Sequence, residues 1–135
     1  MWKRPYLKNF LQDMYKKFNI ILVVGSPIKM GKEIIDAITE FENVYEDIIS
    51  INDLIIFENH EVVNLSKLKN IDKNNTVIID HDCWGFLLDK YNGIEISPYQ
   101  ANKTDSELPK LAAFLDIIYE NENAIKYLQS LRENK

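Results

Sequence analysis

The chain has 135 residues, a formal net charge of −5 and a hydrophobic content of 46%. This length fits a single domain over residues 1–135, and the hydrophobic content can form a layered core. The negative charge would repel a phosphate backbone and the lysines are not clustered, so nucleic acid is not an expected partner. The longest apolar run, Ile20 to Val24, is far shorter than the ~20 residues that cross a bilayer. The sequence therefore shows no membrane span, and no targeting segment is visible.

The first half of the chain predicts helix, strand, helix and strand in that order. Apolar residues at three- and four-residue spacings predict a helix from about Tyr6 to Lys17. Ile20 to Val24 is β-branched and continuously apolar, which is typical of a parallel strand buried on both faces. Pro27 then opens a second helix, and Ile48 to Ile51 is the next expected strand. The inward face of this second helix is expected to consist of Ile34, Ile35, Ile38 and Phe41.

The second half predicts shorter elements followed by two helices. Leu54 to Phe57 and Val62 to Leu65 are expected to form a hairpin. Thr76 to Asp80 is the second expected buried strand, and Gly93 to Ile96 alternates as an edge strand does. Between them, Trp84 to Leu88 is expected to be a short helical turn. The two final helices are expected to bury Leu108, Leu111, Ala112, Leu115 and Ile118, and then Ala124, Ile125, Leu128 and Leu131.

Strands that alternate with helices indicate an α/β fold with a mostly parallel sheet flanked by helices. In such sheets, ligands bind at the carboxyl ends of the strands. Two segments lie at such ends, Val24 to Pro27 and Asp80 to Asp82. These are the expected places for a functional site.

Both segments have alternative interpretations. The stretch from Gly25 to Lys32 follows a strand and opens a helix, as a phosphate-binding loop does. It departs from that motif because Glu33 replaces the Ser or Thr that binds Mg²⁺, and Pro27 removes an amide. Asp80-His81-Asp82 offers two carboxylates to a divalent cation, but without a third ligand a structural role for Asp80 is favoured. The one cysteine, Cys83, has no disulfide partner in the chain and is expected to be half-buried.

Four short motifs then occur in a fixed order along nearly the whole chain. They are Lys3-Arg4-Pro5, Asn64-Leu65-Ser66-Lys67-Leu68, Val77-Ile78-Ile79-Asp80 and Tyr91-Asn92-Gly93-Ile94. The ordered set resembles the phosphatase-like domain that RNA polymerase C-terminal-domain phosphatases share with a mitochondrial protein-import receptor. This resemblance implies a haloacid-dehalogenase-like fold.

The resemblance also implies a degenerate active site. In this family an aspartate at the end of the first core strand attacks phosphate, and that strand would precede Lys3. The first core strand is therefore expected to be absent, and the domain to be truncated at its N-terminus. The phosphate-binding Ser or Thr corresponds to Val24 and the phosphate-binding Lys to Val63, neither of which can donate a side-chain hydrogen bond. Only Asp80 remains at the Mg²⁺ position, so we expect no phosphatase activity and no cofactor, with Mg²⁺ conceivable only at this vestigial site.

The function that the resemblance implies is therefore protein binding. The C-terminal part of the chain is more similar to the import receptors than to the phosphatases. These receptors bind presequences at the mitochondrial inner membrane, on the intermembrane-space side. The implied partners are presequence-bearing proteins and channel subunits of the presequence translocase, and the implied process is protein import into the matrix. Basic amphipathic presequences suit an acidic domain. Two alternatives stay open, a Mg²⁺-dependent protein serine/threonine phosphatase and a degenerate domain without an independent function.

Overall fold

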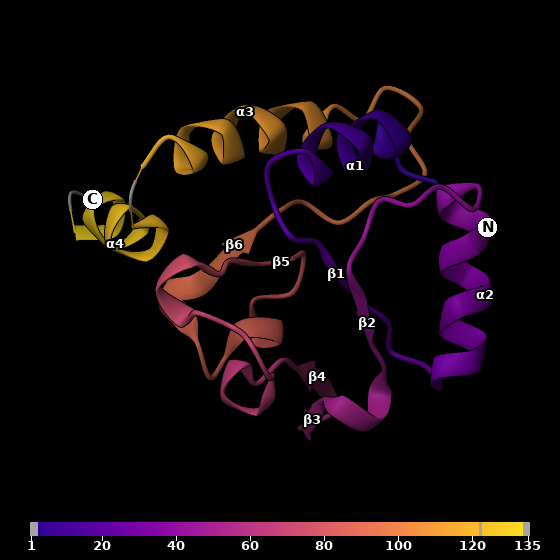
Figure 1. The fold of residues 1–135 in the computed structure, drawn as a ribbon, viewed down its shortest axis with the longest axis horizontal. Coiled ribbons are helices and arrows are strands. Elements are labelled where there is room, and N and C mark those ends of the chain that lie inside the picture. Colours follow the sequence, from indigo (N-terminus) through magenta and orange to yellow (C-terminus); the bar gives the residue numbers. More distant parts are fainter. Residues whose placement is uncertain (1–2, 122, 134–135) are drawn as a thin grey trace. The chain divides into compact units, whose positions relative to one another are not determined.

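The computed structural model describes residues 3–121 and 123–133, which form two compact units (Figure 1). The first unit extends to Leu54 and includes Tyr99–Ala112. The second comprises Ile55–Pro98 and continues from Ala113. The expectation of one domain over residues 1–135 stays a prediction.

The first unit contains a pair of parallel strands and two of the predicted helices. Its elements are α1 (Leu7–Tyr15), β1 (Ile21–Val23), α2 (Ile28–Thr39) and β2 (Asp47–Ile49). β1 pairs with β2 in parallel, with Leu22 opposite Ile48 (Figure 1). The predicted helix–strand–helix–strand order is confirmed, although each element is shorter than expected.

Two expectations for the first unit are wrong. Val23 is 47% exposed rather than buried, because β1 pairs only with β2 among the described residues. Phe41 is 80% exposed rather than on the inner face of α2. The helix ends at Thr39, and both Glu40 and Phe41 then adopt left-handed backbone conformations that turn the chain away.

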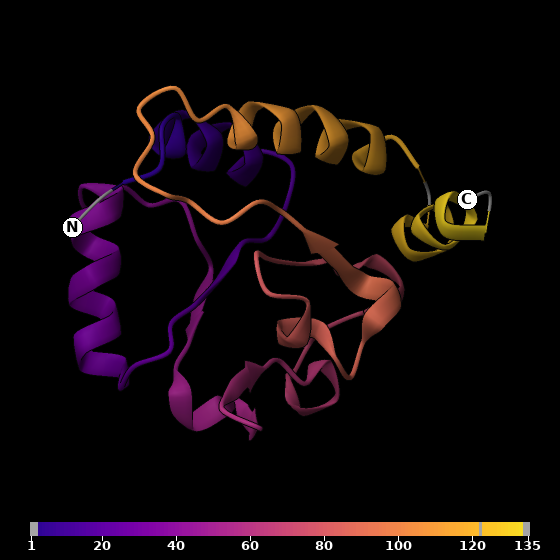
Figure 2. The ribbon, with the colours of Figure 1, turned by 180° about the vertical axis from the view of Figure 1, so that it is seen from behind.

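The second unit contains a hairpin and another pair of parallel strands. The hairpin consists of β3 (Ile55–Phe57) and β4 (His60–Val62). A hairpin here was predicted, but its second strand begins at His60 and not at Val62, because Glu58 and Asn59 alone form the turn. β5 (Ile78–Asp80) pairs in parallel with β6 (Gly93–Glu95), and the two lie side by side in Figures 1 and 2. The expected burial of the whole β5 strand is wrong at Ile79, which is 38% exposed.

Two longer helices and several short 3₁₀ turns complete the chain. Helix α3 (Glu107–Tyr119) begins in the first unit and ends in the second, and α4 (Ala124–Glu133) belongs to the second. The expected inner residues of these helices are buried, except that Ala112 is half-buried and Leu131 is 38% exposed. The 3₁₀ turns are η1 (Ile51–Asp53), η2 (Leu65–Lys67), η3 (Lys73–Asn75), η4 (Cys83–Phe86) and η5 (Lys90–Asn92).

None of the helices within residues 3–121 and 123–133 has the length and apolarity that a bilayer span requires.

Candidate functional site

Asp80 ends β5, and its carboxylate is directed into the loop that follows. The backbone N–H of Asp82 donates a hydrogen bond to Oδ1 of Asp80 over 3.0 Å. Nδ1 of His81 lies 3.5 Å from the same oxygen. This is an Asx turn, in which a short carboxylate satisfies the backbone two residues further along the chain. The structural role expected for Asp80 is therefore present.

Gly85 brings two of the predicted site positions together. A Cβ atom at Gly85 would overlap with the Asp80 carboxylate, so the carboxylate lies directly against the glycine backbone. The carbonyl of Gly85 accepts a hydrogen bond of 2.9 Å from the N–H of Val63. Val63 is only 7% exposed. Sequence reasoning missed Gly85 because nothing in the sequence indicates such a close approach.

A cluster of an acid, an imidazole and two aromatic rings lies beside this loop. Oδ1 of Asp82 accepts the N–H of Trp84 over 3.0 Å, and Oδ2 lies 2.9 Å from Nδ1 of His60. The His60 ring stacks on Trp84 with a centroid distance of 4.6 Å and an interplanar angle of 15°. Phe57 stacks on the same indole at 6.0 Å. The hydrogen bond from His60, followed by that from the Trp84 amide, lowers the pKa of Asp82 below its ordinary value.

Val24, the other position matched to phosphate binding, lies in the first unit. Its N–H donates to the carbonyl of Ile49 over 2.9 Å, which extends the pairing of β1 with β2. Its side chain lies against the α-carbon of Gly31, where a Cβ atom would overlap with it. Val24 therefore serves as a packing residue at the start of α2.

The basic residues of the N-terminal motif, Lys3 and Arg4, form ion pairs. Arg4 donates two hydrogen bonds to the Asp105 carboxylate, of 2.8 and 3.0 Å, and its guanidinium lies 5.7 Å from the centre of the Tyr99 ring. The hydrogen bond from Arg4 is the main cause that holds the pKa of Asp105 below its ordinary value. Lys3 lies 3.7 Å from Glu40. Since the side chains of Arg4 and Asp105 are only 11% and 14% exposed, the pair has a structural role.

The remaining motif positions also have structural partners. Leu65 is buried, and its N–H donates to Oδ2 of Asp89 over 3.2 Å. The N–H of Ser66 donates to Oδ1 of Asn64, which caps η2.

Asn92 and Gly93 fix the entry into the parallel pair of the second unit. The Asn92 side chain donates to the carbonyls of Lys73 and Thr76, each over 2.8 Å. Gly93 lies under the Phe86 ring, which would collide with any Cβ atom there. Both positions therefore determine how β5 and β6 are held.

The loop after β5 contains an exposed thiol but, among its described residues, no cluster of metal ligands. In the part of the chain that the structure describes, no three His, Cys, Asp or Glu side chains gather where they could hold a metal ion. Cys83 is exposed, so its expected half-burial is wrong, because η4 turns the side chain outward. The geometry is instead that of a carboxylate–imidazole–aromatic surface, which can bind cations and apolar groups.

Comparisons with known proteins relate the chain to one family. The family described as "NLI interacting factor-like phosphatase" matches residues 1–126. The chain is 30% identical over 116 residues to "CTD small phosphatase-like protein 3" of Caenorhabditis elegans, covering 85% of this chain and 40% of that protein. It is 26% identical over 121 residues to "Mitochondrial import inner membrane translocase subunit TIM50-A" of Drosophila melanogaster, covering 89% of this chain and 34% of that protein. The chain thus spans 40% and 34% of the lengths of these two curated relatives.

The fold also has a counterpart among solved structures. The fission yeast RNA polymerase II CTD phosphatase Fcp1, bound to beryllium fluoride, superimposes with a TM-score of 0.59. The match covers 97% of this chain and 38% of that one, at 17% identity. The expected haloacid-dehalogenase-like α/β fold is confirmed.

Proposed function

This chain belongs to the NLI interacting factor-like phosphatase family, and from that membership we propose that it is a non-catalytic, protein-binding member. The ligand that it binds would be a basic amphipathic presequence. The process in which it acts would be protein import across the mitochondrial inner membrane. The similarity to the Drosophila translocase subunit TIM50-A supports this reading.

The observation that carries the proposal is the burial of Val63. The family resemblance implies that Val63 takes the place of the phosphate-binding lysine, and its side chain is 7% exposed. A valine cannot neutralise a phosphoryl charge, and one missing contact of this kind costs about 3 to 4 kcal/mol of barrier in other enzymes. Val24 replaces a hydroxyl residue in the same way. A phosphatase with both replacements would lose two electrostatic contacts to the transferred group.

The proposed partners follow from charge. The net charge is −5, and presequences are basic and amphipathic. The proposed location is the intermembrane-space side of the mitochondrial inner membrane. The proposed partners there also include the channel subunits of the translocase. No bound cofactor is required for this function.

Titration of the chain into a fluorescein-labelled presequence peptide tests the proposal. We expect saturable binding that weakens as salt is added, because opposite charges are screened. Absence of saturable binding would reject the import function.

A second candidate is a Mg²⁺-dependent protein phosphatase, favoured by the higher identity of 30% to the Caenorhabditis elegans phosphatase-like protein. Turnover of a phosphopeptide in the presence of Mg²⁺, lost in Asp80→Asn, would support this candidate. It would also reject the assignment as a non-catalytic member.

A further inference from the structure

An apolar cavity lies between α1, β1 and α2 of the first unit. It has a volume of about 320 Å³, and its walls come from these three elements alone within the described part of the chain. No charged residue belongs to these walls. Thr39 does, but its hydroxyl already donates to the carbonyl of Ile35 over 2.8 Å. The cavity therefore suits aliphatic side chains and offers them no free polar side chain.

The aliphatic walls of this cavity are incompletely covered. Leu7 of α1, Leu22 of β1, and Ile34 and Ile38 of α2 line the cavity and are only half-buried. The two strands and two helices of the first unit thus leave apolar surface beside β1 that a further element could cover.

β1 has a free edge next to this cavity. The N–H of Val24 donates to the carbonyl of Ile49 over 2.9 Å, toward β2. Backbone groups alternate between the two edges of a strand, so those of Ile21 and Val23 are directed away from β2. Among the described residues, β1 pairs with no strand but β2, and β2 contributes no wall to the cavity. The cavity therefore lies toward the free edge of β1.

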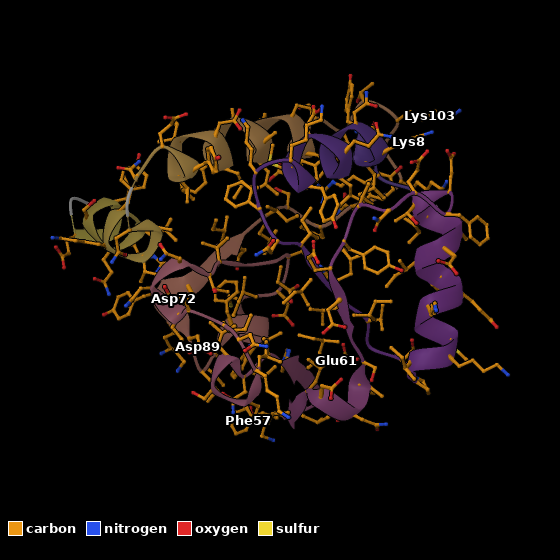
Figure 3. All side chains as sticks on the ribbon, in the orientation of Figure 1. Lys8, Phe57, Glu61, Asp72, Asp89 and Lys103 are labelled. Carbon is orange, nitrogen blue, oxygen red and sulfur yellow. The ribbon has the colours of Figure 1, made fainter. Side chains whose placement is uncertain are left out.

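This edge lacks the charges that usually protect an open strand. Residues 18–28 contain no Asp, Glu, Lys or Arg, and Val23 is 47% exposed. Lys8 of α1, which is labelled in Figure 3, bonds to Glu40 at the end of α2 over 2.8 Å, and neither residue lines the cavity. An uncharged open edge of this kind pairs readily with another extended chain.

We propose that the free edge of β1 and the adjacent cavity form a docking site, the β1 site, for an extended segment of another protein that carries apolar residues at alternate positions. The backbone of the segment bonds to Ile21 and Val23. Because side chains alternate between the faces of a strand, every second residue of the segment enters the cavity. A helix or a small apolar molecule would leave the backbone groups of β1 unpaired. The β1 site goes beyond the proposed binding of presequences and does not rest on it.

The test uses a short fluorescein-labelled peptide with valine at every second position and threonine between the valines. Its binding to the intact chain is followed by fluorescence anisotropy. We expect saturable binding that does not weaken as salt is added, since no ion pair takes part. Two further peptides carry N-methyl groups on the backbone of either all valines or all threonines. One should bind within about threefold of the unmethylated peptide and the other at least about tenfold more weakly, because only one set of amides faces β1.

Variants of the chain test the two parts of the β1 site separately. Val23→Pro removes the N–H that faces the free edge while the pairing with β2 stays in place. We expect it to raise the Kd at least about tenfold, whereas Val23→Thr, which keeps the N–H, should stay within about threefold. Ile38→Asp places a charge in the cavity wall and should also raise the Kd at least about tenfold. Its control is Ala37→Asp, at the exposed neighbouring position of α2.

Circular dichroism checks that each variant is folded, and if Val23→Pro is not, the methylated peptides and Ile38→Asp decide. Absence of binding by the folded chain, equal binding of the two methylated peptides, or variants that bind as well as their controls would each overturn the β1 site. These outcomes leave the titration with a presequence peptide unaffected. Self-association that is lost in Val23→Pro and is not displaced by the peptide would assign the edge to a second copy of the chain, which also overturns the proposal.

Discussion

The pair formed by Arg4 and Asp105 joins residues 101 positions apart with two hydrogen bonds. Because the pKa of Asp105 is lowered in the folded chain, the pair stabilises the fold at neutral pH. This contribution is fully present above the unfolded carboxyl pKa of about 3.9. It is lost as the pH falls through the lower pKa of the folded state. We expect Asp105→Asn to reduce the free energy of unfolding at neutral pH, with the difference from the original chain vanishing in acid.

Urea unfolding at a series of pH values measures this difference. Asp13→Asn is the control, since the Asp13 carboxylate is 67% exposed and lies 3.9 Å from Lys16. Exposed pairs of that kind contribute little. A pH-independent effect of Asp105→Asn would contradict the ionic origin.

The close approach of Gly93 to the Phe86 ring leaves no room for a side chain at this position. Because a Cβ atom at Gly93 would enter the Phe86 ring, Gly93→Ala should lower the free energy of unfolding by about 1 to 3 kcal/mol, as overpacked cores do. Gly25→Ala is the control, at an exposed glycine without a positive φ. Thermal denaturation of both variants distinguishes them, and equal stabilities would show that the ring moves aside at no cost.

The motif residues were found from the sequence, but most of their partners were not. Arg4, Asn92 and Gly93 stood out through the family resemblance. Asp105 did not, because it lies 101 positions from Arg4 in the chain and belongs to no motif. Only the fold brings such pairs into contact. The sequence therefore predicted which positions matter, while their structural role came from the packing.

Among the elements, the hairpin turn carries backbone strain. Glu58 has a φ of 49° and Asn59 a φ of 66°, so both central residues are left-handed. Hairpins favour such turns because their twist matches the strands, and Asn tolerates the conformation better than Glu. We expect Glu58→Asn to raise the free energy of unfolding by about 0.5 to 1 kcal/mol, measured by urea denaturation.

The control for this prediction is Glu61→Asn, which makes the same chemical change in the regular strand β4. It should be neutral or slightly destabilising, since Asn is unfavourable in strands. Stabilisation by both variants would point to charge rather than backbone conformation.

Element types were predictable, whereas burial was predicted well for the last two helices and less well for the strands. Ile20 to Val24 was correctly predicted to contain a parallel strand from its β-branched apolar run. The prediction that this strand is buried on both faces is wrong at Val23. An apolar sequence pattern indicates that a strand can be buried, but it does not indicate whether another element covers the strand. The prediction that Phe41 is buried is wrong for a different reason. Phe41 continues the helical spacing of apolar residues, but the helix ends at Thr39 and the backbone turns before Phe41.

For the whole molecule, the most consequential feature is that the two parallel pairs are short and open. Among the described residues, β1 pairs only with β2, and β5 only with β6. Open strand edges with exposed apolar residues promote association. We expect Val23→Lys/Ile79→Lys to raise the monomer fraction at high protein concentration, as measured by size-exclusion chromatography with light scattering.

Ile117→Lys is the matched control for this prediction. Ile117 is 48% exposed, but it lies on helix α3 and not on a strand. If this change raises the monomer fraction as much as the strand variants do, surface hydrophobicity rather than the open edges drives association.

Trp84, which stacks on His60, can serve as a fluorescence probe of the second unit. The emission of an indole depends on the groups that it contacts, and the chain has only two tryptophans. In a Trp2→Phe background, all tryptophan emission comes from Trp84. Because His60 stacks on this indole, His60→Gln should change the emission intensity, as measured by steady-state fluorescence. A ligand that contacts the same ring would change the emission too, so this protein could report its own occupancy without a dye.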